Sequence, residues 1–218
     1  MALAIFDLDN TLLNGDSDYL WGKFLAQQGH VDTQLYEKEN QRFYDEYVAG
    51  TLDIFEFLEF SLAPLSQMDM SELAELHNRF MDECIRPLIT DQSRALIQKH
   101  VEKDDTLLII TATNLFITAP IAEELGIPNI LATDPEVIDN RYTGKVYGTP
   151  CFREGKVERL TSWLKETDDD LSDSYFYSDS HNDLPLLELV DKSIAVDPDE
   201  TLRSHAEMKG WDIISLKD

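Results

Sequence analysis

Residues 3–11, Leu-Ala-Ile-Phe-Asp-Leu-Asp-Asn-Thr, decide how this chain folds. They begin with a short apolar run over residues 3–8 that acids end, and this run predicts a buried strand. Asp7 and Asp9 stand at the end of that strand with one residue between them. Because the alternation of side chains stops past a strand end, both carboxylates and the N–H groups of the turn can face one point.

Three further apolar runs predict strands at residues 107–111, 175–178 and 194–196. The helical patterns between and after them cover residues 91–103, 116–126, 155–165, 184–190 and 199–210. This alternation is typical of βαβ units, so we expect an α/β fold with a doubly wound, mostly parallel sheet. In such sheets ligands bind beyond the carboxyl ends of the strands. The polar pairs expected at that edge are Asp7 and Asp9, Thr111 and Thr113, and Asp179 and Asp183.

Residues 15–86 differ from the rest because they carry several helical patterns and no convincing strand. We therefore expect an inserted, all-helical cap domain over residues 15–86, and a core domain made of residues 1–14 and 87–218. Residues 133–150 carry glycines and prolines among alternating apolar residues, which predicts a small hairpin or a long loop.

The charge of the 218-residue chain limits its partners. Lys and Arg number 18 against 43 Asp and Glu, a formal net charge of −25, which argues against binding nucleic acid or anionic membranes. The two cysteines, Cys84 and Cys151, predict free thiols, and the N-terminus has no basic region typical of a signal peptide. No apolar run approaches the ~20 residues that span a bilayer. We expect a cytoplasmic protein, and its oligomeric state stays open.

The segment Asp7-Leu8-Asp9-Asn10-Thr11 also predicts a metal site. Two acids this close repel each other unless a cation or a proton lies between them. Mg²⁺ prefers carboxylate and water oxygens. An Asp-x-Asp in an acidic protein is usually a surface feature, but its place directly after a buried strand and before an inserted cap favours a site.

Four motifs in order resemble the haloacid dehalogenase-like superfamily of phosphohydrolases, within the branch that contains phosphoserine phosphatase. The DxDx[TV] pattern of that family is present as residues 7–11, and its strand-terminal Thr or Ser as Thr111. Its lysine is present as Lys156, and its acidic loop as residues 178–183, Ser-Asp-Ser-His-Asn-Asp, where many members read GDGxND. The motifs cover nearly the whole chain, and they imply a Rossmann-like core with a helical cap.

The resemblance implies Mg²⁺-dependent hydrolysis of a small phosphomonoester, in which Asp7 attacks phosphorus and forms an aspartyl-phosphate. Asp9 would protonate the leaving alkoxide and then take a proton from water. Mg²⁺ would be held by the Asp7 carboxylate, the backbone carbonyl of Asp9 and Asp179. Asp183 would lie beside the metal and orient Lys156. The residues implied to bind the phosphoryl group are Thr111, Ala112, Lys156 and Asn182.

Some of these residues also suit structural roles. Asp183 is a natural N-cap for a helix over residues 184–189. His181 is expected to face solvent. Asp16 lies at the position where phosphoserine phosphatases carry a Glu that contacts the substrate amine, so it would bind an ammonium or imidazolium group, or else cap the helix that contains Tyr19.

The expected substrate follows from one position at which this sequence differs from the phosphoserine phosphatase pattern. Ser61 aligns with the position where phosphoserine phosphatases carry the Arg that pairs the substrate carboxylate, and Arg42 or Arg86 are the candidate substitutes. We therefore expect an amine-bearing alcohol phosphate without a carboxylate, such as histidinol phosphate, with phosphoserine as the alternative. A phosphotransferase or mutase, and a non-catalytic metal-binding protein, are the remaining classes.

Overall fold

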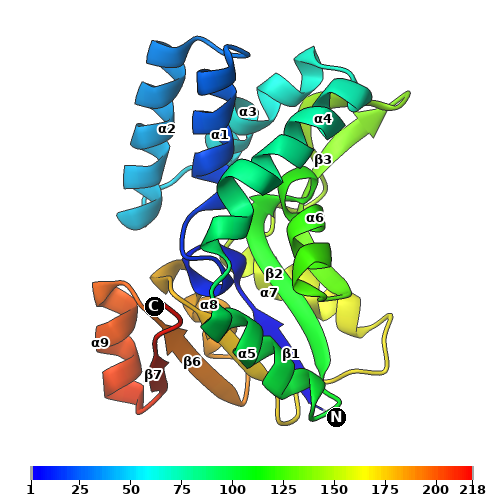
Figure 1. The fold of residues 1–218 in the computed structure, drawn as a ribbon. Coiled ribbons are helices and arrows are strands. Elements are labelled where there is room, and N and C mark those ends of the chain that lie inside the picture. Colours follow the sequence, from blue (N-terminus) through cyan, green and yellow to red (C-terminus); the bar gives the residue numbers. More distant parts are fainter. Residues whose placement is uncertain (1, 218) are drawn as a thin grey trace.

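The computed structural model describes residues 2–217, and a seven-stranded sheet with the order β4-β3-β2-β1-β5-β6-β7 forms its core (Figure 1). Every neighbouring pair is parallel except β3 and β4, so the predicted doubly wound α/β fold is confirmed. The strands are β1 (Leu3–Phe6), β2 (Thr106–Asn114), β3 (Asn129–Ile138), β4 (Arg141–Tyr147), β5 (Tyr175–Ser178), β6 (Lys192–Val196) and β7 (Asp212–Ile214).

Both faces of the central strand β1 are buried, as its continuous apolar sequence predicts. Ala4 and Phe6 pack into one cluster with α5 and α6, whereas Leu3 and Ile5 pack on the other face with α7, α8 and α9. The helices of the core are α5 (Asp91–Val101), α6 (Leu115–Leu125), α7 (Glu154–Leu164), α8 (Leu184–Leu187) and α9 (Glu200–Lys209).

The segment between β1 and α5 is helical and forms the cap in the upper part of Figure 1. A side-chain carboxylate caps the first turn of each of its four α-helices, as expected for Asp at an N-cap. The helices are α1 (Ser17–Gln28), α2 (Thr33–Val48), α3 (Ile54–Leu62) and α4 (Met70–Phe80). The structure also contains five short helical turns between residues 2 and 217: η1 (Leu8–Leu12), η2 (Ala63–Gln67), η3 (Met81–Ile85), η4 (Arg86–Leu88) and η5 (His181–Asp183).

The chain leaves the core for the cap and returns to it at one place. Leu13 and Ile89 form an isolated antiparallel bridge, and the Asn14 N–H donates to the Leu88 carbonyl at 2.9 Å. Aromatic residues of α1 and α4, among them Trp21, share one apolar cluster with Phe6 of the sheet. The base of the cap is therefore packed onto the core.

Two parts of the sheet differ from the prediction. Residues 133–150 do contain a hairpin, but its first strand begins earlier, at Asn129, and pairs with β2 over Leu108–Ile110 before it turns. Strand β7 was missed because it has three residues and only Ile213 and Ile214 are apolar. The hairpin also contacts the cap, since β4 packs on α3 and η2.

No helix among residues 2–217 has both the length and the apolar character that a bilayer crossing requires.

Candidate active site

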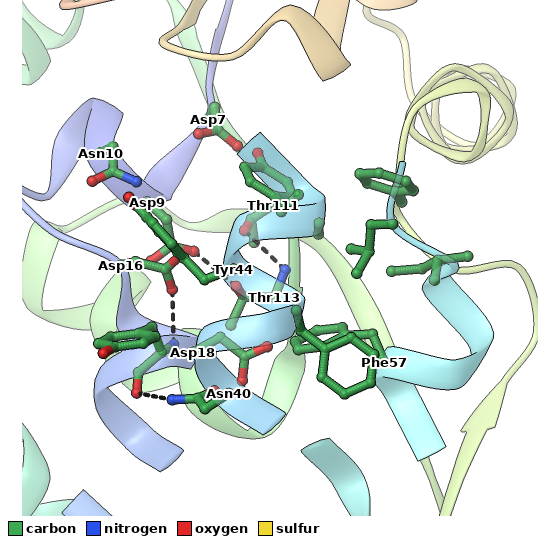
Figure 2. Close-up of a pocket in the computed structure, with 17 residues that line it drawn as sticks. Asp7, Asp9, Asn10, Asp16, Asp18, Asn40, Tyr44, Phe57, Thr111 and Thr113 are labelled. Carbon is green, nitrogen blue, oxygen red and sulfur yellow. Dashed lines mark hydrogen bonds between the residues drawn. The ribbon is translucent and has the colours of Figure 1, made fainter. Parts of the chain in front are cut away.

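Polar residues converge at the carboxyl ends of β1, β2 and β5. Phe6 is in register with Ile109 of β2 and Tyr177 of β5, so the residues that follow each of them meet at one edge. The pairing of β2 with β3 shifts between Ile110 and Asn114. This irregularity frees residues 111–113 to line a pocket beside Asp7 and Asp9 (Figure 2).

Lys156 joins two carboxylates at the floor of this site. Its ammonium lies 2.8 Å from Asp7 Oδ1 and 2.7 Å from Asp183 Oδ1, and all three residues are at most 5% exposed. Burial alone would lower the pKa of Lys156, but the charges of Asp183 and Asp7 outweigh it and raise the pKa above its ordinary value. The lysine therefore stays cationic inside the protein, where a phosphoryl group could use its charge.

Thr11 connects the ends of β1 and β5. Its hydroxyl lies 3.1 Å from Asp7 Oδ2 and 3.2 Å from Asp179 Oδ1, and it accepts a hydrogen bond from the Asp179 N–H at 3.1 Å. Burial raises the pKa of Asp7 to about 7 against the opposing charge of Lys156. Burial, and then the charge of Asp7, raise the pKa of Asp179 well above its ordinary value. These two carboxylates lack full charge compensation from the protein.

The donor set at this point fits Mg²⁺. Hard carboxylate oxygens are its preferred ligands, and Asp7 and Asp179 present them around one hydroxyl. The carboxylates of Asp9 and Asp183 have other partners, and residues 2–217 contain no group of three or more His, Cys, Asp or Glu side chains placed to hold a metal. The arrangement suits a site of two carboxylates completed by a backbone carbonyl and water.

Asp9 is held apart from its neighbour Asp7 by its own hydrogen bonds. Asp9 Oδ1 accepts from the Ser17 N–H at 2.6 Å, and Oδ2 accepts from the Thr113 hydroxyl at 2.8 Å. Burial, and then the charge of Asp16, raise its pKa to about 6. A carboxyl with a pKa near neutrality can both donate and accept a proton, and the two acids of the motif are thereby placed in different environments.

The pocket above these residues spans about 650 Å³, part of which is open to solvent, and it is walled by the cap. Helices α2 and α3 supply most of its aromatic and apolar lining, and α1 supplies acids (Figure 2). Among residues 2–217, no Lys or Arg lines this pocket. The lining residues are Asp7, Asp9, Asn10, Asp16, Asp18, Tyr19, Asn40, Phe43, Tyr44, Tyr47, Leu52, Ile54, Phe57, Thr111, Ala112, Thr113 and Phe152.

Asp16 has one of the two roles that its sequence position left open, the helix cap, and it also lies in the pocket. Its Oδ1 accepts from the Tyr19 N–H at 2.8 Å and caps α1, and its side chain also lines the pocket. Asp18 lies two residues further and lines the same pocket, and among residues 2–217 its carboxylate has no hydrogen-bonding or ion-pairing partner. Burial, and then the charge of Asp16, raise the pKa of Asp18 well above its ordinary value.

Two expectations about the acidic loop were wrong. Asp183 does not cap α8 with its side chain, because its carboxylate is taken by Lys156 and by the Ser178 hydroxyl, 2.7 Å away. His181 does not face solvent: its side chain is 20% exposed, and Nδ1 lies 2.8 Å from Asp199 Oδ2.

The phosphate-binding candidates are divided between the pocket and its edge. Thr111 and Ala112 line the pocket, and the Thr111 hydroxyl accepts from the Thr113 N–H at 3.2 Å. Asn182 is 3% exposed and turns toward the cap, where its Nδ2 donates to the Tyr47 carbonyl at 3.0 Å.

The candidate substitutes for a carboxylate-binding arginine lie elsewhere. Arg42 pairs with Glu39, Glu46 and Glu56 on the surface of the cap. Arg86 pairs with Asp82 and Glu124.

Ser61 is buried but is not part of the pocket lining. The predicted Thr113 does line the pocket, whereas sequence reasoning missed Asp18 and Asn40; the spacing of Asp16 and Asp18 at the start of one helix was the available signal for Asp18.

Comparison with known proteins agrees with this geometry. The chain is 48% identical to a histidinol-phosphatase from Neisseria meningitidis serogroup C (strain 8013), over 99% of both chains. A crystal structure of a protein with unknown function from Bordetella pertussis Tohama I matches with a TM-score of 0.94 at 44% identity, covering 99% of each chain. The structure of a phospho-aspartyl intermediate analogue of phosphoserine phosphatase shares the fold, with a TM-score of 0.73 at 21% identity over 99% of this chain and 93% of that one.

The family model of haloacid dehalogenase-like hydrolases matches residues 4–188, a range that includes the ends of β1, β2 and β5 and the start of α7. The chain therefore belongs to the haloacid dehalogenase-like hydrolases and is a phosphatase that acts on phosphomonoesters.

Proposed function

We propose that this protein hydrolyses a small, cationic alcohol phosphate, and that histidinol phosphate is its substrate. The observation that carries the proposal is the lining of the pocket, which, within the described part of the chain, contains four aspartates and no Lys or Arg. An anionic carboxylate on the substrate would find no partner there, and an unpaired buried charge is costly. The name of the Neisseria relative supports the same substrate.

Asp16 and Asp18 are the proposed partners of the cationic part of the substrate. They extend from the first turn of α1 into the pocket, beyond Asp7 and Asp9 (Figure 2). Asn40 and the ring of Tyr44 lie on the facing helix α2 and provide polar and aromatic surface beside these acids. An ammonium or an imidazolium between carboxylates and aromatic faces is favourably placed.

The proposed reaction has two displacements at phosphorus. Asp7 attacks, the bond between phosphorus and the ester oxygen breaks, and the leaving alkoxide takes the proton of Asp9. Water then attacks the aspartyl-phosphate, gives its proton to Asp9, and the bond from phosphorus to the Asp7 oxygen breaks to release inorganic phosphate. Lys156 and Thr111 are proposed to neutralise and hold the phosphoryl oxygens in both steps.

Mg²⁺ is the proposed cofactor, with Asp7, Asp179 and the backbone carbonyl of Asp9 as its protein ligands. When bound, it would supply positive charge for the transferring phosphoryl group and relieve the repulsion between the carboxylates. Asp183 is proposed to act through Lys156, which it already contacts. We also propose that residues 15–86 form the cap domain, and that the enzyme works in the cytoplasm, where free thiols such as Cys84 and Cys151 persist.

The test is a panel of phosphomonoesters assayed with Mg²⁺ and with chelator. It should contain histidinol phosphate, phosphoserine and an aryl phosphate whose aryl group is uncharged. An alcohol acceptor that competes with water is added in parallel assays. We expect Mg²⁺-dependent release of inorganic phosphate with the highest kcat/KM on histidinol phosphate. Higher efficiency on phosphoserine would refute the substrate, and phosphoryl transfer to the alcohol in place of water would identify a phosphotransferase.

A further inference from the structure

The start of α7 is tied to the cap by Arg153, which has no role in the proposed chemistry. Arg153 precedes α7 and lies three residues before Lys156. Its guanidinium donates to Asn182 Oδ1 from Nε at 3.0 Å and from Nη2 at 2.8 Å, and Nη2 also donates to the Gly50 carbonyl. One side chain of the core thus holds both a loop of the core and a backbone group of the cap.

The cap presents backbone carbonyls at this point because α2 ends there. The last carbonyls of a helix have no partner within it, and they carry the negative end of the helix dipole. Asn182 donates to the Tyr47 carbonyl at 3.0 Å, and Arg153 donates to Gly50 just beyond the helix. These interactions place a cation and an amide of the core against the C-terminal end of α2.

The cap and the core approach each other closely at Gly50. Its φ is +69°, and a Cβ built there would lie 2.7 Å from His181 Nε2 and 3.4 Å from Arg153 Nη2. The imidazole of His181 is itself held by Asp199. A side chain at position 50 would therefore separate the two surfaces.

The backbone of Arg153 is also unusual. Its φ and ψ are 50° and −120°, a region that a residue with a side chain adopts only when its surroundings impose it. The turn before α7 is tight, because a Cβ at Gly155 would lie 2.1 Å from the Pro150 carbonyl oxygen. The conformation of this turn fixes where α7 begins, and Lys156 is in the first turn of that helix.

We propose that Arg153 is a positioning residue that fastens the C-terminal end of α2 to the core, so that closure of the cap over the pocket depends on its guanidinium. Tyr47, in the last turn of α2, lines the pocket next to Phe152, which directly precedes Arg153 in the sequence. Loosening this contact makes the closed arrangement less populated, and the apparent affinity for substrate falls in proportion. Saturating substrate restores closure, so KM rises while kcat is largely retained.

The test compares Arg153→Met and Arg153→Lys with Arg159→Ala as the matched control. Arg159 lies on α7 itself, but its guanidinium pairs with Asp134 and the Thr149 carbonyl. Hydrogen exchange of residues 47–52 should rise about 10-fold or more in Arg153→Met, and KM should rise about 10-fold to about 100-fold. Arg153→Lys should be intermediate, because an ammonium lacks the planar fork that serves two acceptors.

Gly50→Ala tests the same contact from the cap and should raise KM and the exchange of residues 47–52 in the same way. The assays use both histidinol phosphate and an aryl phosphate, and hydrogen exchange needs no substrate. The result for Arg153 therefore does not depend on whether histidinol phosphate is the natural substrate. Unchanged KM and exchange in Arg153→Met would overturn the proposal. Equal effects in Arg159→Ala would also overturn it, because they would indicate general destabilisation. A fall in kcat at constant KM would overturn it as well, because it would mean that Arg153 acts on the transition state and not on closure of the cap.

Discussion

Both carboxylate oxygens of Asp183 lie within hydrogen-bonding distance of the Lys156 ammonium, Oδ1 at 2.7 Å and Oδ2 at 2.8 Å. Asp183 thus holds the lysine from one side, while Asp7 contacts it from the other. Replacing Asp183 should lower the pKa of Lys156 and leave its ammonium less firmly positioned.

Asp183→Asn should lower kcat/KM by about 100-fold, because an amide neither raises the pKa of Lys156 nor fixes its ammonium as a carboxylate does. The measurement is steady-state hydrolysis at several pH values. As the pH is raised, the variant should begin to lose activity at a lower pH than the wild type does. Asp134→Asn, which removes the partner of Arg159 on another face of α7, is the control. Equal losses in both variants would refute the assigned role.

Asp7→Asn should reduce turnover by about 10³-fold or more, because the nucleophile is removed. Acid-quenched wild-type enzyme should carry phosphate from labelled substrate, and the variant should carry none. Circular dichroism serves as the check that the variant folds. Phosphate bound covalently to the folded variant would place the nucleophile elsewhere.

Asp9→Asn should affect substrates according to their leaving groups. An alkyl phosphate needs a proton on its leaving oxygen, so its kcat should fall by about 10²-fold to about 10⁴-fold. An aryl phosphate with a good leaving group needs little assistance, and its single-turnover phosphorylation of Asp7 should fall far less. Equal losses on both substrates would instead point to a purely structural role for the bonds from Asp9 to Ser17 and Thr113.

Asp18→Asn should raise KM for a cationic phosphate by about 10-fold to about 100-fold, because a charged partner in the pocket is lost. It should leave KM for an aryl phosphate without a cationic group nearly unchanged. Asp32→Asn removes one charge from the cap at the N-terminus of α2, outside the pocket, and is the control. A similar rise for both substrates would contradict a specific contact between Asp18 and a cation.

A buried histidine makes stability depend on pH. His100 lies 2.8 Å from Asp105 and 2.9 Å from the Tyr177 hydroxyl, and burial lowers its pKa despite Asp105. The unfolded chain therefore binds a proton more readily than the native state, and stability falls as pH drops below about 6.5. Its partner acts in the same direction, because the pKa of Asp105 is lowered in the native state by its hydrogen bonds, which outweigh burial.

His100→Gln removes this titration. The advantage in Tm of the wild type over this variant should shrink as the pH is lowered from about 7.5 to about 5, because the native state resists protonation of His100. Thermal melts at matched ionic strength provide the measurement. An advantage that stays constant or grows on acidification would show that His100 is charged in the native state.

The sequence was sufficient for the strands β1, β2, β5 and β6 and for the polar residues at their carboxyl ends, because both follow from local rules. A continuous apolar run such as residues 3–6 has few alternatives to a buried strand, and parallel strands bring their carboxyl ends together wherever they lie in the chain. For this reason the order of the apolar runs is enough to predict that Asp7, Thr111 and Asp179 lie near one another.

The sequence does not show which of several possible partners a side chain binds in the folded chain. The position of Asp183 before a helix predicts a cap, but a lysine 27 residues away takes its carboxylate in the folded chain. Asp18 has the same local appearance as any acid in a first helical turn, where the helix dipole favours it. Only the placement of α2 opposite α1 shows that it lines a pocket.

The bridge between Leu13 and Ile89 has a consequence for how such an enzyme can diversify. Because the two connections to the cap run side by side, everything between them can change in length or sequence while the spacing of β1 and β2 stays constant. Substitutions that alter which molecule is selected and substitutions that alter phosphoryl chemistry then fall in separate segments of the gene, so selection can act on one without disturbing the other. Arg153 and its contact with Gly50 are an exception, since they tie the two segments together.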